Sequence, residues 1–432
     1  MTIRSFAGGI RPPGGKELTK NAPVKIVLPG KELVYPLTQY GGGAAKALVK
    51  AGEKVLCGPQ IAASKGADGV PIHASVSGRV VGIKPRRIYT GEEVKCVVVE
   101  NDGLYDEVDI PAPRDPEEME EAEILARIEE AGIVGLSGGG FPTHLKMQPP
   151  QPKKIAYLIV NGVECEPFLT GDCRLMLEET ERLIAGIKVL LRLFPYARGA
   201  IAVTTGNEEC LELLRERTDK EQRIDVRGLR AKYPQGAERQ LVAAATGRAL
   251  DSAQEPADVG CIIVNVATVI AVYNAVVQGR NLISRIVTVS GDAVIAPQNF
   301  GVRLGTSMSI LLEAAGGFRR PPEKIIVGGP LMGFAINDAN VPVAKETGAL
   351  LCFSKDEIAA MAPTACINCG RCAEVCPERL WPARLAELAE RGDSAGFRAY
   401  GGQECSVCGC CAYACPAKRF LTQAIGVMLK TL

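Results

Sequence analysis

Two short cysteine runs near the C-terminal end constrain this chain more than any other feature of its sequence. The first reads C-I-N-C-G-R-C-A-E-V-C-P from Cys366, and the second reads C-S-V-C-G-C-C-A-Y-A-C-P from Cys405. Both have the spacing C-x2-C-x2-C-x3-C-P, which in two-cluster iron–sulfur folds directs the fourth cysteine of each run to the other cluster. The spacing therefore predicts two [4Fe–4S] clusters, one held by Cys366, Cys369, Cys372 and Cys415 and the other by Cys405, Cys408, Cys411 and Cys376.

Disulfide and zinc interpretations of these cysteines are weaker. Disulfide frameworks belong to secreted chains, whereas the first residues here lack the apolar segment of a signal peptide. Zinc sites use two C-x2-C pairs, usually without a third cysteine two residues further on. The additional Cys410 is expected to be a bystander. The cysteines outside the runs lack metal-ligand spacing and are expected to be reduced and buried: Cys57, Cys96, Cys165, Cys173, Cys210, Cys261 and Cys352.

Length, charge and histidine content exclude several classes of protein. A chain of 432 residues suits about three domains. Its net charge of +1 predicts no nucleic-acid partner and no polybasic membrane segment. No apolar run is long enough for a transmembrane helix, so any membrane role is expected to come through partner subunits. With only His73 and His144, a histidine metal centre is disfavoured, as is a Ser–His–Asp hydrolase unless His144 is the base.

The N-terminal quarter predicts a small all-β unit. Residues 1–25 are rich in Pro, Gly and Lys and suggest an extended leader, and short β runs broken by Gly follow over residues 24–110. The stretches VKAGEKVLCGPQIA and IHASVSGRVVGI resemble the two halves of the barrel-sandwich fold of biotinyl and lipoyl carriers. The carriers' lysine signature is missing, and the nearby Lys65 is not in that context. We therefore expect a structural or docking module rather than a carrier arm.

Strands and helices alternate through the middle of the chain. A Pro-rich linker and a Glu-rich amphipathic helix come first, over residues 111–131, and Gly132 ends the helix. Strands are then expected over 155–160, 200–203 and 261–266, and helices over 174–193, 208–217, 236–246 and 268–277. This alternation predicts an α/β layer with a mostly parallel sheet.

The complete fold class is multidomain, with α/β and α+β parts. Residues 286–330 suit a β-grasp-like module, and the tail after Pro416 predicts one short apolar helix. The expected divisions are a leader and barrel-sandwich domain (1–112), an α/β domain (113–280), a β-grasp-like module (281–335), a linker (336–363) and a two-cluster ferredoxin domain (364–432).

A glycine-rich loop, GIVGLSGGGFPTHLK, opens the α/β domain over Gly132–Lys146. Its glycines allow backbone N–H groups to turn inward around a phosphate, and Lys146 supplies a cation. The loop is neither a P-loop nor a G-x-G-x-x-G fingerprint, and it precedes a strand instead of following one. A nucleotide or flavin phosphate site and a flexible turn therefore both remain open on this pattern alone.

Polar residues also follow the predicted strands, at the sheet edge where ligands bind in open α/β folds. The first strand ends in Asn161-Gly-Val-Glu164-Cys-Glu166-Pro, in which the amide suits a heterocycle and the carboxylates suit ribose or ribityl hydroxyls. A solvated turn is the alternative for this motif taken alone. The stretch Y-P-Q-G-A-E-R from Tyr233 opens a helix, and Asn265 taken singly suits a helix cap.

These motifs together resemble a known family. GIVGLSGGGFPTHLK, VNGVECEP, YPQGAER and VNVAT resemble the motifs of the FMN-carrying, NADH-binding 51-kDa subunit of respiratory complex I. The stretch VTVSGDAV followed by LGTSMSILLEAAGG resembles the β-grasp (SLBB) module of that subunit. With the barrel-sandwich unit, the ferredoxin pair and the opening GGIRPPGGKELT, the whole chain resembles the RnfC family, which belongs to the Rnf electron transport complexes.

The resemblance implies a flavin and nucleotide site. It implies that Phe141 stacks against bound nicotinamide nucleotide and that Glu166 and Glu238 contact NADH. FMN would be held without a covalent bond by Gly135, Gly138, Gly139, Gly140, Lys146, Asn161, Glu164, Gly236 and Asn265. The sequence departs from the complex I pattern at Val163, Ala237 and Val264, where three polar flavin contacts are lost.

A flavin is the expected converter between NADH, which donates two electrons together as hydride, and clusters that accept one at a time. No acid–base residue is then needed for hydride transfer. The resemblance implies a peripheral NADH-oxidising subunit of a reversible, ion-translocating ferredoxin:NAD+ oxidoreductase. It would lie on the cytoplasmic face of the membrane with the other subunits of the complex, and it would meet ferredoxin only indirectly. The alternatives are a soluble, cobalamin-reductase-like enzyme and a ferredoxin-like carrier with a degenerate flavin domain.

Overall fold

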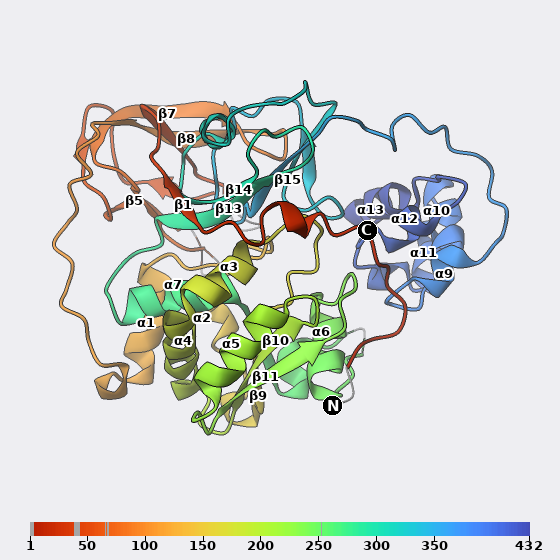
Figure 1. Cartoon of the computed structure of the whole chain (residues 1–432), viewed down its shortest axis with the longest axis horizontal. Coiled ribbons are helices and arrows are strands. Elements are labelled where there is room, and N and C mark those ends of the chain that lie inside the picture. The colour runs from red at the N-terminus through yellow and green to blue at the C-terminus, as the bar shows by residue number, and fades with distance from the viewer. Residues whose placement is uncertain (1–3, 39–43, 65, 67–68, 252) are drawn as a thin grey trace.

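The computed structural model describes residues 4–38, 44–64, 66, 69–251 and 253–432, so Lys65 lies outside the described residues. A β unit, an α/β domain and a second, mixed sheet pack together, and a small helical domain lies at one end (Figure 1). No helix of the described residues is long and apolar enough to cross a membrane.

The predicted N-terminal unit consists of two antiparallel sheets around a core that includes Leu33, Ile61 and Val97. One sheet has the order β2–β8–β7–β4 and the other β3–β5–β6. The strands are β2 (Glu32–Pro36), β3 (Lys46–Ala47), β4 (Lys54–Val55), β5 (Gln60–Ala63), β6 (Ile72–His73), β7 (Gly78–Arg87) and β8 (Glu93–Asn101).

The α/β domain has a parallel sheet, as the alternation predicted. Its four strands have the order β11–β10–β9–β12, and the edge strand β11 was not among the predicted strands. Its strands are β9 (Tyr157–Gly162), β10 (Arg198–Thr204), β11 (Ile224–Leu229) and β12 (Cys261–Asn265), and its helices are α1 (Glu121–Glu130), α2 (Thr143–Lys146), α3 (Gly171–Glu178), α4 (Thr180–Arg192), α5 (Glu208–Thr218), α6 (Glu238–Thr246) and α7 (Val266–Val276). The prediction of one continuous helix over 174–193 is wrong, because non-helical backbone at Glu179 divides this stretch into α3 and α4. The strand register places Asn161 beside Asn265, so the polar ends of β9 and β12 meet.

The second sheet corrects two sequence predictions. Its order is β1 (Lys25–Val27), β14 (Gln298–Arg303), β13 (Ser284–Ser290), β17 (Ala349–Phe353), β15 (Lys324–Val327) and β16 (Phe334–Ile336), with α8 (Met308–Ala314) after β14. The strand β1, expected in the barrel-sandwich unit, instead pairs in parallel with β14. The strand β17 lies inside the predicted linker 336–363, because its buried A-L-L-C residues fill the centre of this sheet.

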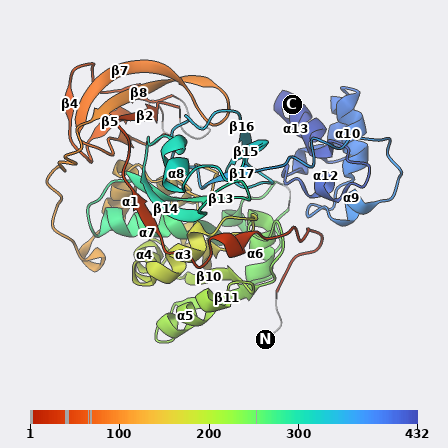
Figure 2. The same ribbon diagram turned by 45° about the horizontal axis from the view of Figure 1, so that its top comes forward.

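The C-terminal domain carries both cysteine runs in loops and short helices. The helices are α9 (Arg371–Glu374), α10 (Pro382–Glu390), α11 (Ser394–Ala399), α12 (Cys410–Ala414) and the predicted tail helix α13 (Leu421–Thr431). Leu385, Phe397 and Ile425 form its small core. Figure 2 shows the domain, in blue, beside α6 of the α/β domain and the turn between β15 and β16.

Candidate functional site

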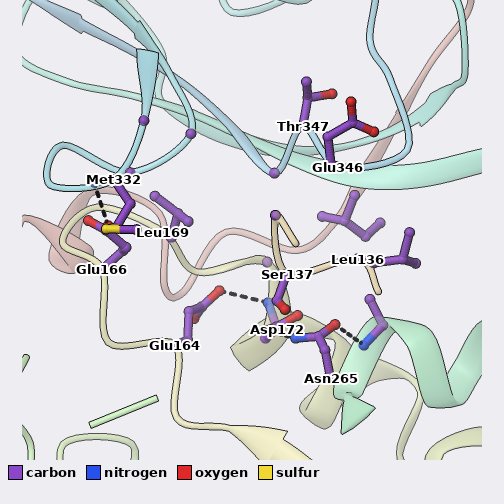
Figure 3. Close-up of a pocket in the computed structure, with 18 of the residues that line it drawn as sticks. Leu136, Ser137, Glu164, Glu166, Leu169, Asp172, Asn265, Met332, Glu346 and Thr347 are labelled. Carbon is purple, nitrogen blue, oxygen red and sulfur yellow. Dashed lines mark hydrogen bonds between the residues drawn. The ribbon is translucent and has the colours of Figure 1, made fainter. Parts of the chain in front are cut away.

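A pocket of about 270 Å³ lies between the α/β domain and the second sheet. The ends of β9 and β12 and the glycine loop line one side, and the β15–β16 turn with residues 346–348 lines the other (Figure 3). The structure thereby brings together half of the predicted flavin and nucleotide residues: Gly138, Asn161, Glu164, Glu166, Gly236 and Asn265. The site thus combines residues from well-separated stretches of the chain.

The other predicted residues do not line this pocket: Gly135, Gly139, Gly140, Phe141, Lys146 and Glu238. The glycine loop closes on itself, since the Gly135 N–H donates to the Phe141 carbonyl at 2.8 Å and the Gly140 N–H to the Gly135 carbonyl at 3.1 Å. Lys146 pairs with Glu238 at 2.9 Å, and Phe141 is 51% exposed. These residues therefore form the rim and support of the loop.

The tip of the glycine loop is the part best shaped for a ligand. Gly138 has φ +103°, a conformation that side chains other than glycine rarely adopt. A Cβ atom added at Gly138 or Gly139 would meet nothing within 4 Å, so space is open in front of the backbone. A flavin or nucleotide could approach this backbone closely, which is what a glycine-lined cradle requires.

Asn161 and Asn265 hold the two strand ends in place. The Asn161 Nδ2 group donates to the Gly236 carbonyl at 3.0 Å. Asn265 caps α7, as expected, by accepting from the Ala267 N–H at 2.9 Å, and its Nδ2 group donates to the Asp172 carboxylate at 2.6 Å. Burial, together with the charge of Glu164, raises the pKa of Asp172. Asp172 was not predicted as a site residue, because no motif marks it in the sequence.

Glu164 and Glu166 are ordered by the protein, so the solvated-turn interpretation is wrong for both. The Glu164 carboxylate accepts from the N–H groups of Asp172 at 2.8 Å and Cys173 at 3.4 Å, at the N-terminus of α3. The Glu166 carboxylate accepts from the N–H groups of Leu331 at 3.2 Å and Met332 at 3.0 Å. Burial raises the pKa of Glu166 to about 7. Both carboxylates thus tie the strand end to neighbouring elements.

The three departures from the complex I pattern do not alter the pocket wall. Val163 and Val264 are buried in the hydrophobic cores on either side of the sheet. Ala237 precedes α6 as its N-cap residue. None of the three is among the residues that line the pocket. The apolar side chains therefore replace polar groups at positions that this structure does not present to a ligand.

The wall that other domains supply was not predicted from the sequence. The Tyr89 hydroxyl donates to the Glu346 carboxylate at 3.2 Å, and both residues line the pocket with Arg285. The Arg285 guanidinium donates to the Leu136 carbonyl at 3.2 Å and to the Lys345 carbonyl. These residues come from the β unit, the second sheet and the predicted linker. No local motif marks them, because only the domain packing brings them to the pocket.

The eight predicted cluster cysteines surround two separate cavities of the C-terminal domain. Cys366, Cys369, Cys372 and Cys415 line one cavity, and Cys376, Cys405, Cys408 and Cys411 line the other. These are the two sets that the spacing predicted. Among the residues that the structure describes, no three His, Cys, Asp or Glu side chains converge on a point that would suit a single metal ion. A cubane spreads its thiolates around a volume, because each one binds a different iron.

Backbone N–H groups already point at several of these sulfurs. Each of the following N–H groups donates to a cysteine Sγ at 3.4 Å: Asn368 to Cys366, Leu380 to Cys376, and Val407 to Cys405. Such hydrogen bonds to sulfur help to set cluster potentials. The donor set and its N–H partners therefore fit [4Fe–4S] clusters.

The two cysteine sets differ in their surroundings. We call Cys376, Cys405, Cys408 and Cys411 the inner set, and Cys366, Cys369, Cys372 and Cys415 the outer set. The inner set lies against the α/β domain, where the Tyr233 hydroxyl donates to the Cys408 carbonyl at 2.8 Å. In the outer set, Cys366 and Cys369 are exposed. Cys410, which we predicted to be a bystander, lines the same cavity as the inner set, is fully buried and packs with Ile10 and Tyr233.

Four known domain families match successive parts of the chain, in the same order as the domains of the structure. Residues 4–104 match the RnfC barrel sandwich hybrid domain, residues 128–274 the Nuo51 FMN-binding domain, residues 286–335 the SLBB domain and residues 356–419 the 4Fe-4S dicluster domain. The expected fold class is thereby confirmed. In solved structures, an NAD+-reducing [NiFe]-hydrogenase chain shares the fold with a TM-score of 0.51 and 18% identity, over 73% of this chain and 64% of that chain.

Curated relatives extend over nearly the whole chain. The C subunit of the Na(+)-translocating ferredoxin:NAD(+) oxidoreductase complex of Acetobacterium woodii is 37% identical over 98% of this chain and 96% of its own length. The proton-translocating counterpart of Clostridium ljungdahlii is 37% identical over 90% of this chain and 85% of its own length. The C subunit of the ion-translocating oxidoreductase complex of Yersinia pestis is 35% identical over 89% of this chain and 62% of its own length. The chain therefore belongs to the RnfC family, the C subunits of ion-translocating oxidoreductase complexes.

Proposed function

We propose that this chain is the NADH-oxidising peripheral subunit of a membrane-bound, ion-translocating ferredoxin:NAD+ oxidoreductase. It is an oxidoreductase subunit with an FMN-binding domain and a 4Fe-4S dicluster domain. Near-complete coverage of relatives that are named as parts of such complexes favours this function over a soluble reductase. The remaining subunits would bind it at the cytoplasmic face of the membrane, and ferredoxin would exchange electrons with it only through them.

The contact between the inner cysteine set and the α/β domain carries this proposal. Tyr233 accounts for much of it, because its hydroxyl reaches the Cys408 carbonyl while its ring packs against Cys410. Gly236, three residues further on, lines the pocket. FMN, when bound, supplies the conversion between a two-electron hydride donor and one-electron acceptors. One short segment, from Tyr233 to Gly236, thus contacts the inner set at one end and lines the pocket at the other.

Ion pairs hold the C-terminal domain in this position. Arg239 of α6 lies 3.3 Å from the Glu378 carboxylate and 3.1 Å from that of Glu404. Gln240 donates to Glu378 at 3.0 Å. Because these contacts flank the inner set, we propose that electrons enter there and leave through the exposed outer set. Arg239, Gln240 and Tyr233 would then act by keeping the two centres close.

Within the pocket we propose that the predicted residues act by binding and orientation. The open backbone at Gly138 would receive the flavin or its phosphate, and Asn161 and Asn265 would fix the strand ends beneath it. Phe141, which is exposed at the rim, would cover the nicotinamide nucleotide. Lys146 and Glu238 would then support the loop from outside. No residue is required to transfer a proton during hydride transfer.

The decisive test is anaerobic reconstitution of the purified chain with iron, sulfide and FMN, followed by addition of NADH. The proposal predicts about eight iron atoms per chain, one bound FMN, and loss of visible cluster absorption when NADH is added. Iron incorporation without any FMN uptake or NADH response would contradict it. Recovery of the chain with membrane proteins, after mild solubilisation, would separate membership of a complex from a soluble reductase.

A further inference from the structure

The N-terminal leader carries a motif to which the proposed function gives no role. Its residues read G-G-I-R-P-P-G-G-K-E-L-T over Gly8–Thr19, and the short 3-10 helix η1 (Lys16–Leu18) is its one helical turn among the described residues. Figures 1 and 2 show the leader, in red, passing between the α/β domain and the blue C-terminal domain. A segment far away in sequence thus touches both halves of the proposed electron path.

The first half of the motif packs on the inner cysteine set. The Gly9 N–H donates to the Val375 carbonyl at 2.8 Å, and Ile10 and Tyr233 exchange backbone hydrogen bonds of 2.8 and 2.9 Å. Gly8 has φ +78°, and a Cβ atom there would lie 2.7 Å from the Cys376 carbonyl oxygen. Glycine is therefore required where the leader crosses the backbone of a predicted cluster ligand.

The second half inserts a lysine behind the pocket. The Lys16 Nζ group donates to the carbonyls of Glu164 at 2.7 Å and Leu169 at 2.5 Å. It also lies 3.6 Å from the Glu164 carboxylate, whose side chain is only 6% exposed. Glu164 has φ +42°, which is uncommon for a residue with a side chain. Lys16 thus bonds both the strained backbone and the carboxylate of one pocket residue.

Lys16 also acts on the charge of the pocket. Three carboxylates lie together on this wall: Glu164, Glu166 and Asp172. The positive charge of Lys16 lowers the pKa of Glu166 and of Asp172, opposing the larger effect of burial on each. Arg285 is the other cation that acts on Asp172. Without Lys16, an anionic ligand would meet a more negative wall.

We propose that Lys16 is a positioning residue of this pocket, which fixes Glu164 and offsets the three carboxylates so that a flavin phosphate ester can bind. The inference rests on the proposed function, because it takes FMN to be the ligand. It extends the site beyond the α/β domain to the leader. The same extended segment contacts both the pocket residue Glu164 and the predicted cluster ligand Cys376.

The test is a titration of the cluster-loaded chain with FMN, in which the quenching of flavin fluorescence measures binding. Lys16→Met should weaken FMN binding by roughly tenfold or more, since a charge-assisted hydrogen bond is lost. Lys16→Arg keeps the charge and should bind nearly as wild type does. Lys20→Met removes an exposed lysine of the same leader and serves as the matched control. The Lys16→Met deficit should be larger at pH 8 than at pH 6, because fewer carboxylates are protonated at the higher pH.

Two outcomes would overturn the inference while the proposed function stands. In one, wild type binds FMN and Lys16→Met binds equally well. In the other, Lys16→Arg is as weak as Lys16→Met although both variants are folded. If Lys16→Met does not fold, Lys16→Gln, which keeps an N–H donor but loses the charge, provides the same comparison. If wild type itself takes up no FMN, the proposed function fails first and the inference with it.

Discussion

Lys345 gives the sharpest stability prediction, because it is a buried lysine that joins three parts of the fold. The residue is 1% exposed, and its Nζ group donates to the Pro71 carbonyl at 2.8 Å and the Gly132 carbonyl at 2.7 Å. Burial lowers the pKa of Lys345 to about 7, although the neighbouring Glu346 opposes the change. His73 lies beside it, but burial lowers the pKa of His73 to about 3, so it stays neutral above pH 6.

Protonation of Lys345 differs between the folded and the unfolded chain, and this difference makes the stability depend on pH. In the unfolded chain the lysine titrates near 10.5, so between pH 7 and 10.5 the unfolded state binds a proton that the folded state lacks. Stability should therefore rise with pH across this window and fall as pH drops towards 7. At about 1.36 kcal/mol per pH unit, the free energy of unfolding can change across this window by roughly 5 kcal/mol at most.

Lys345→Met removes this titration and also leaves the two carbonyls without a donor, at a cost of about 1–3 kcal/mol each. We expect wild type to be several kcal/mol more stable than the variant near pH 9.5, and to lose most of that advantage near pH 6.5. Anaerobic denaturant unfolding of both proteins at three pH values measures the difference. Lys31→Met, which removes a lysine whose side chain is 84% exposed, is the control. A difference between wild type and Lys345→Met that is constant with pH would refute the reasoning.

Three further predictions concern a glycine beside Lys345, the additional cysteine Cys410 and the helix cap Asn265. Gly132→Ala should lower the melting temperature far more than Gly247→Ala, because both have positive φ but only at Gly132 would a Cβ atom lie 2.5 Å from a carbonyl oxygen. Cys410→Ala should keep about eight iron atoms per chain, whereas Cys408→Ala should lose about half of them, and iron analysis distinguishes the two. Asn265→Ala should lower the free energy of unfolding by more than the roughly 1 kcal/mol of a lost helix cap. The variant also loses the bond to the buried Asp172 carboxylate, and calorimetry measures the total loss.

The parts of the molecule that sequence could predict are those specified by local spacing. The two cysteine sets follow from C-x2-C-x2-C-x3-C-P alone, and the structure gathers the same sets around two cavities. The alternation of strands and helices likewise predicted the parallel sheet. The strand β17 was missed because four buried apolar residues in a long connecting stretch give no periodic signal.

The pocket was predictable only on one side. Asn161, Glu164 and Asn265 stand at strand ends, where parallel topology brings side chains together. Tyr89 and Glu346 lie 257 residues apart, and their contact depends on how the β unit packs on the second sheet. Such a pairing depends on tertiary packing rather than on any motif, so a sequence pattern cannot predict it.

Electrons are proposed to pass between the pocket and the outer cysteine set through the inner set. Rapid mixing of NADH with reconstituted variants that each lack one cluster tests this path directly. Cys369→Ala, which removes the outer cluster, should leave reduction of the inner cluster at the wild-type rate. Cys408→Ala, which removes the inner cluster, should leave the outer cluster oxidised or reduced far more slowly. Reduction of the outer cluster at the wild-type rate in Cys408→Ala would contradict the account.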